Sequence, residues 1–169
     1  MYVIASLGSP AMDITESIPS EEYAEDAFGE AMRVFCRFFA SKLGFGYPVS
    51  AVDFRAVLLA QDPELRLGAA TFLLGMSRSV AVREYIARSL LPTLFDALTG
   101  LLTVESEAAA ARRLLRAAHA LSGRCAAEIS KHADVLQAYC SRRPDVRSCA
   151  AEVLATLNHV PVSVITSPC

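Results

Sequence analysis

Apolar residues recur every three or four positions through most of the chain, with polar residues between them. That spacing puts the apolar side chains on one face of an α-helix. Gly and Pro interrupt the pattern at intervals and divide it into separate helices. The predicted helices cover residues 21–43, 50–59, 64–77, 80–87, 92–102, 105–123, 126–131, 134–141 and 145–157. Because strand-like alternation is found at residues 160–165 alone, we expect an all-α fold.

Four of the predicted helices share a small residue that is followed by apolar residues four and seven positions later. The small residues are Ala31, Ala69, Ala117 and Ala150, which are separated by 38, 48 and 33 positions. Arg124 breaks the seven-position rule in the third helix. Self-similarity at such a period predicts a helical solenoid, in which a small side chain lets the neighbouring helix approach and the larger residues fill the core between repeats.

Three stretches of the chain resemble the armadillo repeat family. Residues 54–77 are similar to the family's second helix, acidic turn and third helix, and residues 127–157 repeat that arrangement. Residues 83–98 are similar to its junction of first and second helices. The resemblance covers roughly residues 28–157, and the uneven spacing would equally suit the HEAT-type relatives. It implies a right-handed armadillo-like helical solenoid of about three and a half repeats.

The chain is thereby divided into a repeat domain at residues 23–157, an N-terminal tail at 1–22 and a C-terminal tail at 158–169. In the family, the third helices line a concave groove, whose facing positions fall two and six residues after the small anchor. Those positions are Arg33, Arg37, Thr71, Gly75, His119, Gly123, Glu152 and Thr156. Nuclear-import receptors of the family place Trp and Asn in the groove to hold a basic peptide. This chain has no Trp and no Asn at those positions, so such a receptor is not expected.

The composition is that of a folded domain that binds no nucleic acid as its primary ligand. Hydrophobic residues make up 53% of the 169 positions and charged residues 20%, which favours a packed core. The formal net charge is -2, so no strong positive field gathers phosphates. Charged residues interrupt every apolar run after about residue 12, and none reaches the ~20 residues that span a bilayer.

The cysteines and the first residues bear on the compartment. Five cysteines, an odd number, stand scattered at positions 36, 125, 140, 149 and 169, which does not indicate a disulfide framework. Residues 1–12 are mildly apolar but lack the basic head of a secretory signal. We therefore expect a reducing compartment, the cytoplasm or the nucleus.

Several residues invite chemistry, but their spacing does not support it. The last third of the chain holds His119, Cys125, His132, Cys140, Cys149 and His159. No close ligand pair such as CxxC occurs among them, so no metal is expected. Ser122 with His119 or His132 lacks a nucleophile motif and a convincing acidic third member, so no catalytic triad is expected. We expect no enzyme activity and no cofactor.

Three smaller features point to packing or to a partner. Phe35, Phe38, Phe39, Phe45 and Tyr47 are expected to seal the first repeat. Gly68, Gly75 and Gly123 stand inside helices, where a tight helix crossing is favoured over close approach of a ligand. Arg112, Arg113 and Arg116 form the densest basic patch, either as a solvated face or as a docking patch for an acidic partner.

The sequence thus predicts a non-enzymatic adaptor, or a subunit of a larger assembly, that binds a protein partner through the concave third-helix surface and exposed repeat ends. One alternative is a compact bundle that captures an amphipathic helix, as apoptosis regulators and their viral counterparts do, with residues 67–77 as a central buried helix. Another is an armadillo-type chaperone nucleotide-exchange factor.

Overall fold

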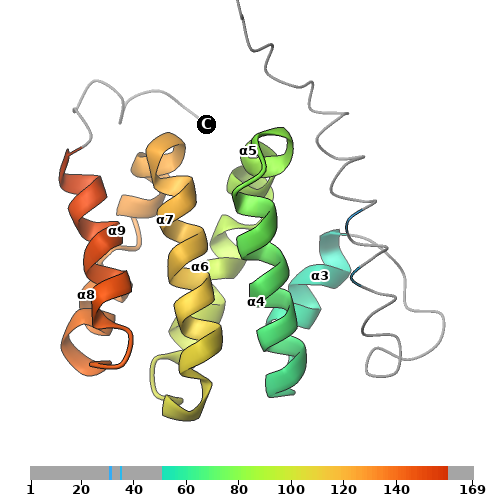
Figure 1. Cartoon of the computed structure of the whole chain (residues 1–169), viewed down its shortest axis with the longest axis horizontal. Helices are drawn as coiled ribbons and strands as arrows, with labels where there is room; N and C mark the ends of the chain where they lie inside the picture. Colours follow the sequence, from blue (N-terminus) through green and yellow to red (C-terminus); the bar gives the residue numbers. More distant parts are fainter. Residues whose placement is uncertain (1–30, 32–34, 36–50, 160–169) are drawn as a thin grey trace, which may run out of the picture.

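The computed structural model describes residues 31, 35 and 51–159, and the described part of the chain is all-helical, as predicted (Figure 1). The helices are α3 (Ala51–Leu58), α4 (Pro63–Ser77), α5 (Val80–Ser89), α6 (Leu91–Leu101), the 3-10 helix η1 (Glu105–Glu107), α7 (Ala108–Ser130), α8 (Ala133–Arg142) and α9 (Arg147–His159). The tails and the possible strand at residues 160–165 lie outside the described residues. The all-α class is therefore confirmed for residues 51–159.

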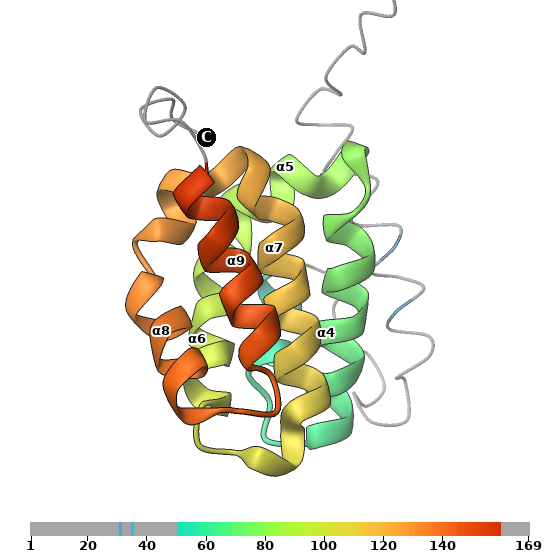
Figure 2. The same ribbon diagram turned by 60° about the vertical axis from the view of Figure 1, so that its left-hand side comes forward.

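The helices form two layers. α4, α7 and α9 lie side by side in a front layer, and α3, α6 and α8 form a back layer behind them (Figures 1 and 2). Each front helix packs on the back helix that precedes it, giving the pairs α3–α4, α6–α7 and α8–α9. All three front helices run in the same direction (Figure 1). The three helix pairs thus follow one another in space in the same order as in the sequence.

Local sequence signals set where the helices begin. The side chain of Asp62 accepts hydrogen bonds from the backbone N–H groups of Glu64 (2.8 Å) and Leu65 (3.3 Å), which caps α4. Pro63 follows in the first turn, where its missing N–H costs nothing. Pro92 takes the same place in α6. These starts agree with the breaks that the sequence predicts.

The helices predicted at 105–123 and 126–131 are one element, α7, with a kink between them. Cys125 has φ -119° and ψ 33°, outside helical values, although backbone hydrogen bonding continues on both sides. The predicted break is thus present as a bend rather than as a loop. Residues 105–107, expected to start the long helix, form η1 instead.

α7 occupies the middle of the front layer and packs against α4, α9 and the back helix α6. Its buried side is correspondingly rich in alanine, because a small side chain lets a neighbouring helix come close. The residues of α7 that are at most 2% exposed before its kink are Ala110, Ala111, Leu114, Leu115, Ala117, Ala118, Leu121 and Ser122. The alanine positions therefore set how closely the front helices pack.

The small residue of the repeat pattern is buried in α4, α7 and α9, and burial is less regular at the other two positions. Ala69, Ala117 and Ala150 are fully buried, and so are Leu73 and Leu121, four positions after the first two of them. Leu154, at the fourth position in α9, and Met76 and Leu157, at the seventh position, are half-buried and pack against the core, and Arg124 is exposed. The seventh position turns toward the rim of the layer, where the helix faces solvent.

An aromatic cluster lies at the α3 end of the described core. Phe35 is 5% exposed, and its ring lies 5.8 Å from that of Phe54 and 5.2 Å from that of Phe72. The expectation that Phe35 seals this end agrees with these contacts. Phe38, Phe39, Phe45 and Tyr47 lie outside the described residues.

A buried arginine joins the second and third helix pairs. Arg143, in the turn between α8 and α9, is 1% exposed and forms a two-pronged ion pair with Asp145, at 2.9 and 2.7 Å. Its Nη1 donates to the carbonyl oxygens of Leu101 (2.6 Å) and Val104 (3.1 Å). Because Leu101 ends α6, the cation satisfies the carbonyl end of that helix and opposes its negative dipole.

Tyr139 completes this group, which we call the Arg143 cluster (Arg143, Tyr139 and Asp145). Its fully buried hydroxyl donates to the carbonyl oxygen of Leu98, at 2.6 Å, in the last turn of α6. Burial raises the pKa of the Tyr139 hydroxyl above its ordinary value. The hydrogen bonds from Arg143 lower the pKa of the Asp145 carboxyl below its ordinary value of 3.8.

Overpacking α7 should destabilise the protein. Ala117→Leu adds three carbon atoms where no space remains, so we expect the free energy of unfolding, measured by urea denaturation, to fall by about 1–3 kcal/mol. Ala109→Leu, on the exposed side of the same helix, is the matched control and should change it by less than about 0.5 kcal/mol. Equal effects of the two substitutions would contradict the assigned packing of α7.

The Arg143–Asp145 pair should make stability depend on pH. Because the pKa of Asp145 is lower in the folded state, its ion pair stabilises the fold above the ordinary pKa of 3.8, and this contribution is lost as pH falls through the lowered value. The stability difference between wild type and Asp145→Asn should be constant between about pH 5 and 7 and shrink toward pH 2. Urea denaturation at a series of pH values measures it. A difference independent of pH throughout would show that the pair does not form.

Candidate docking surface

The predicted groove positions that fall in the described residues lie on one layer. Thr71 and Gly75 are on α4, His119 and Gly123 on α7, and Glu152 and Thr156 on α9. Thr156 is half-buried and the others are exposed. Arg33 and Arg37 lie outside the described residues. The front layer thus brings six residues from three separate parts of the sequence onto one face.

The two threonines on this face use their hydroxyls within their own helices. Thr71 Oγ1 donates to the carbonyl oxygen of Leu67 (2.7 Å), and Thr156 Oγ1 to that of Glu152 (2.9 Å). Such bonds satisfy the hydroxyls within the helix, so neither threonine needs a hydrogen-bond partner from a neighbouring helix.

The glycines do not mark a tight helix crossing, so that expectation was wrong for Gly75 and Gly123. Both are exposed, and a Cβ atom built on either would meet no atom within 4 Å. A glycine inside a helix costs roughly 1 kcal/mol relative to alanine. Packing among the described residues does not account for that cost, because the space above each glycine is open. Gly68 is half-buried.

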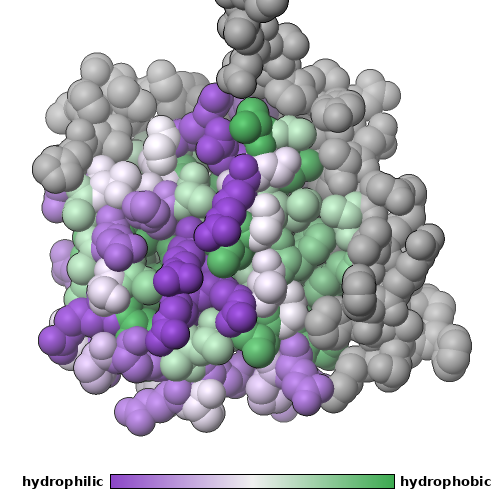
Figure 3. Space-filling view, in the orientation of Figure 1, coloured by the Kyte–Doolittle hydropathy of each residue, from purple (hydrophilic) through white to green (hydrophobic). Residues whose placement is uncertain are grey.

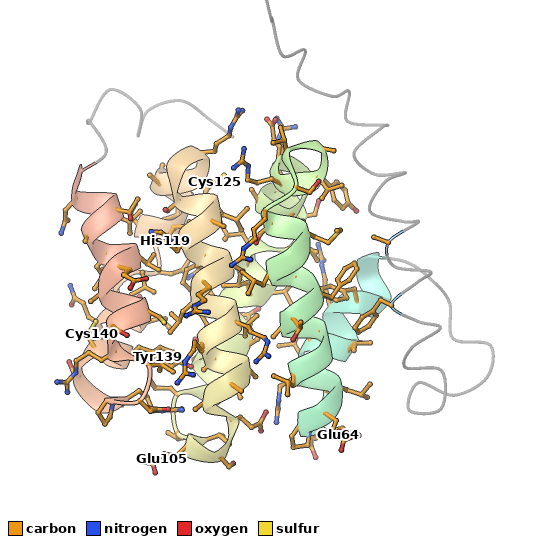
Figure 4. The ribbon with its side chains drawn as sticks, in the orientation of Figure 1. Glu64, Glu105, His119, Cys125, Tyr139 and Cys140 are labelled. Atoms are coloured by element: carbon orange, nitrogen blue, oxygen red, sulfur yellow. The ribbon has the colours of Figure 1, made fainter. Side chains whose placement is uncertain are left out.

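Basic residues run along the exposed side of α7. Arg112, Arg116, His119 and Gly123 stand at successive steps of four, three and four positions and are all exposed. We call this row the α7 stripe. Arg113 lies half-buried beside it, and Arg124 is exposed near its end. Figure 3 shows a hydrophilic band over α7, and Figure 4 shows His119 on the front of that helix.

The predicted basic patch has its positive charge largely uncompensated. Arg112 donates to the carbonyl oxygen of Asp145 (3.2 Å) and Arg113 to that of Ala109 (3.3 Å), both uncharged acceptors. Among the described residues, no carboxylate oxygen lies within 4.0 Å of a side-chain nitrogen of Arg112, Arg113 or Arg116. Glu107, which precedes them, is instead buried in an ion pair with Arg66 of α4.

The row of residues beside this stripe is apolar at its centre. Leu67, Thr71, Leu74 and Arg78 follow the same steps of four, three and four positions on the front of α4, and we call them the α4 stripe. Thr71 and Arg78 are exposed, and both leucines are half-buried. In Figure 3, neutral and hydrophobic residues over α4 adjoin the hydrophilic band of α7. Sequence reasoning missed Leu67, Leu74 and Arg78 as surface residues, although their helical spacing could have indicated them.

The residues that invited chemistry are not assembled into a site. Ser122 is buried and its hydroxyl donates to the backbone carbonyl of His119 (2.7 Å), not to an imidazole ring. The ring of His132 stacks on Phe95, with centroids 4.2 Å apart. Within residues 51–159, three or more His, Cys, Asp or Glu side chains nowhere gather as a metal would require. Among the described helices, none has the length and apolarity to cross a membrane.

Comparison with known proteins identifies no relative. No family model matches the chain, and neither a curated protein nor a solved structure matches it significantly. The armadillo resemblance therefore stays a prediction.

Alanine should be tolerated at the open glycine positions. Gly75→Ala and Gly123→Ala are each expected to raise the free energy of unfolding by about 0.5–1 kcal/mol, because alanine restricts the unfolded chain and its Cβ meets no neighbour. Gly100→Ala, equally open but on the back helix α6, is the matched control and should behave alike. Differential scanning calorimetry measures all three. A loss of stability at Gly75 or Gly123 would mean that these positions have a packing role after all.

Proposed function

We propose that the chain is a short, irregular armadillo-like solenoid that serves as a non-enzymatic adaptor or as a subunit of a larger protein assembly. The succession of paired helices supports this proposal, since front helices that run in one direction and stack in chain order are the arrangement of helical repeat proteins. The working compartment would be the cytoplasm or the nucleus.

The observation that carries the proposal is the exposed front of α7. Arg113 and Arg116 make no ion pair among the described residues, while the arginines that tie helices together, Arg66 and Arg143, are both matched by carboxylates. A cluster of like charges costs electrostatic free energy unless something compensates it. A partner that brings carboxylates to the front layer would supply that compensation. The front layer, the concave third-helix surface of the armadillo reading, is accordingly the proposed binding surface.

The compact-bundle alternative expected residues 67–77 to be a central buried helix. In the structure α4 has an exposed side, which includes Thr71 and Gly75. This arrangement favours the stacked reading over the bundle reading. For the nucleotide-exchange alternative, no observation in the described residues favours it over a general adaptor.

Charge reversal on α7 tests the proposal. Arg113→Glu with Arg116→Glu is expected to reduce the partner recovered with the tagged full chain by about tenfold, since two attractive charges become repulsive. Arg112 is left unchanged because its hydrogen bond to the Asp145 carbonyl crosses to the neighbouring pair. The measurement is affinity purification from the native source with isotope-labelled mass spectrometry.

The matched control is Lys131→Glu with Arg142→Glu, which changes the net charge equally. Lys131 follows α7 and pairs with Glu128, at 2.6 Å, and Arg142 ends α8; both are exposed, and neither belongs to the α7 stripe. The control should retain the partner, and thermal unfolding should show both double variants folded. Equal recovery with the front variant and wild type would refute use of the front layer.

A further inference from the structure

The α4 stripe and the α7 stripe together form a surface that is elongated along the helix axes. Each stripe covers eleven steps along its helix, or about 17 Å at a rise of 1.5 Å per residue. The two helices are neighbours in the front layer and run in the same direction. The surface is therefore an elongated strip, apolar along α4 and basic along α7, with both edges parallel to the helix axes.

The spacing within the stripes is that of a helix. Residues separated by four, three and four positions lie on one line along an α-helix, and a second helix laid beside it presents side chains with the same spacing. An extended chain advances about 3.3 Å per residue and shows alternate side chains to one face, so it would not match these steps along the axis. The strip therefore fits a helix of about twelve residues better than it fits a strand.

The residues of the strip indicate which side chains the bound helix would carry on its two sides. Leu67 and Leu74 leave part of their side chains exposed on α4, which suits small or medium apolar residues. Arg112 and Arg116, four positions apart on α7, suit two carboxylates at the same spacing. Gly123 has open space where a side chain would stand, so another helix can come close to α7 there.

We propose that the front layer binds an acidic amphipathic helix of a partner protein, with its apolar side on the α4 stripe and its carboxylates on the α7 stripe. This inference rests on the proposed function and names the partner's chemistry. A nucleic acid would supply negative charge but no apolar side for Leu67 and Leu74. The chain's net charge of -2 also gives it no general attraction for phosphates.

A random fourteen-residue peptide library displayed on phage, selected against the full chain, tests the chemistry without assuming a sequence. The expected result is enrichment of peptides with Glu or Asp four positions apart and with Leu, Ile or Met at helical spacing on the opposite side. Enrichment of basic peptides, or of peptides with no charge preference, would overturn the proposal. So would a selection that enriches nothing above an unrelated control protein.

The best enriched peptide, labelled with fluorescein, then maps the site by fluorescence polarisation. Arg113→Glu with Arg116→Glu should weaken its binding about tenfold or more, and rising salt should weaken binding to the wild-type chain. Gly123→Leu should weaken it by a similar factor, while Gly100→Leu on the back layer should not. Lys131→Glu with Arg142→Glu should also leave the affinity unchanged. Equal weakening by the front and control variants would show non-specific charge attraction and overturn the proposal.

Two further arms identify the occupant. A version of the peptide with a central proline should lose binding, because proline breaks a helix; undiminished binding would show an extended ligand and overturn the proposal. A labelled peptide of residues 20–32, which holds Glu21, Glu22, Glu25, Asp26 and Glu30, tests a second copy of this chain as the occupant. Tighter binding of that peptide, or of single-stranded RNA, than of the selected peptide would replace the partner helix by one of those ligands.

The two levels of the proposal fail separately. If native-source purification depends on Arg113 and Arg116 but the selected peptides are not acidic helices, the adaptor function stands and this inference falls. If neither assay depends on those arginines, both fall.

Discussion

The packing around α7 is the constraint on which the rest of the structure depends. α7 packs against α4 and α9 on its two sides and also against α6 and α5, so four other described α-helices share its buried surface. Alanine at positions such as 111, 117 and 118 lets these neighbours approach, and leucine at 114, 115 and 121 seals the gaps that remain. A helix used in this way has one free direction, toward the front. Its polar residues are therefore collected on a single face.

The gathering of the polar residues of α7 on one face explains why a chain with slightly negative net charge carries a basic surface. Two carboxylates of this region form buried or partly buried ion pairs: Glu107 pairs with Arg66, and Asp145 pairs with Arg143. Each ion pair includes a residue from the turn inside a helix pair, Glu107 between α6 and α7 and Asp145 between α8 and α9, and satisfies groups that burial would otherwise leave without partners. On the front of α7, Arg113 and Arg116 make no ion pair among the described residues, and Arg112 reaches the Asp145 carbonyl without meeting an opposite charge. Their cost to the isolated chain is the physical basis for expecting an acidic partner.

The sequence predicted the features that depend on periodicity. The small anchors Ala69, Ala117 and Ala150 are buried because helical spacing fixes which face they share, and the exposed front positions follow from the same geometry. The Arg143 cluster was not predicted, because its partners Leu98 and Leu101 lie about 40 positions away and act through backbone carbonyls, which carry no sequence signal. The tight helix crossing expected at Gly75 and Gly123 was wrong for a related reason. A pattern shows that a glycine stands in a helix but not what lies above it.

The Arg143 cluster is also connected to the α7 stripe. Arg112 begins the α7 stripe and its guanidinium reaches the carbonyl oxygen of Asp145, whose carboxylate holds Arg143. The stripe is thus linked through Asp145 to the turn that starts α9 and to the end of α6. A ligand carboxylate that drew Arg112 away would remove one of these links, whereas a ligand bound through Arg113 and Arg116 would leave them intact. The Arg112 guanidinium has further N–H groups besides the one that the Asp145 carbonyl accepts, so the carboxylate proposed beside Arg112 can bind it while this link stays in place.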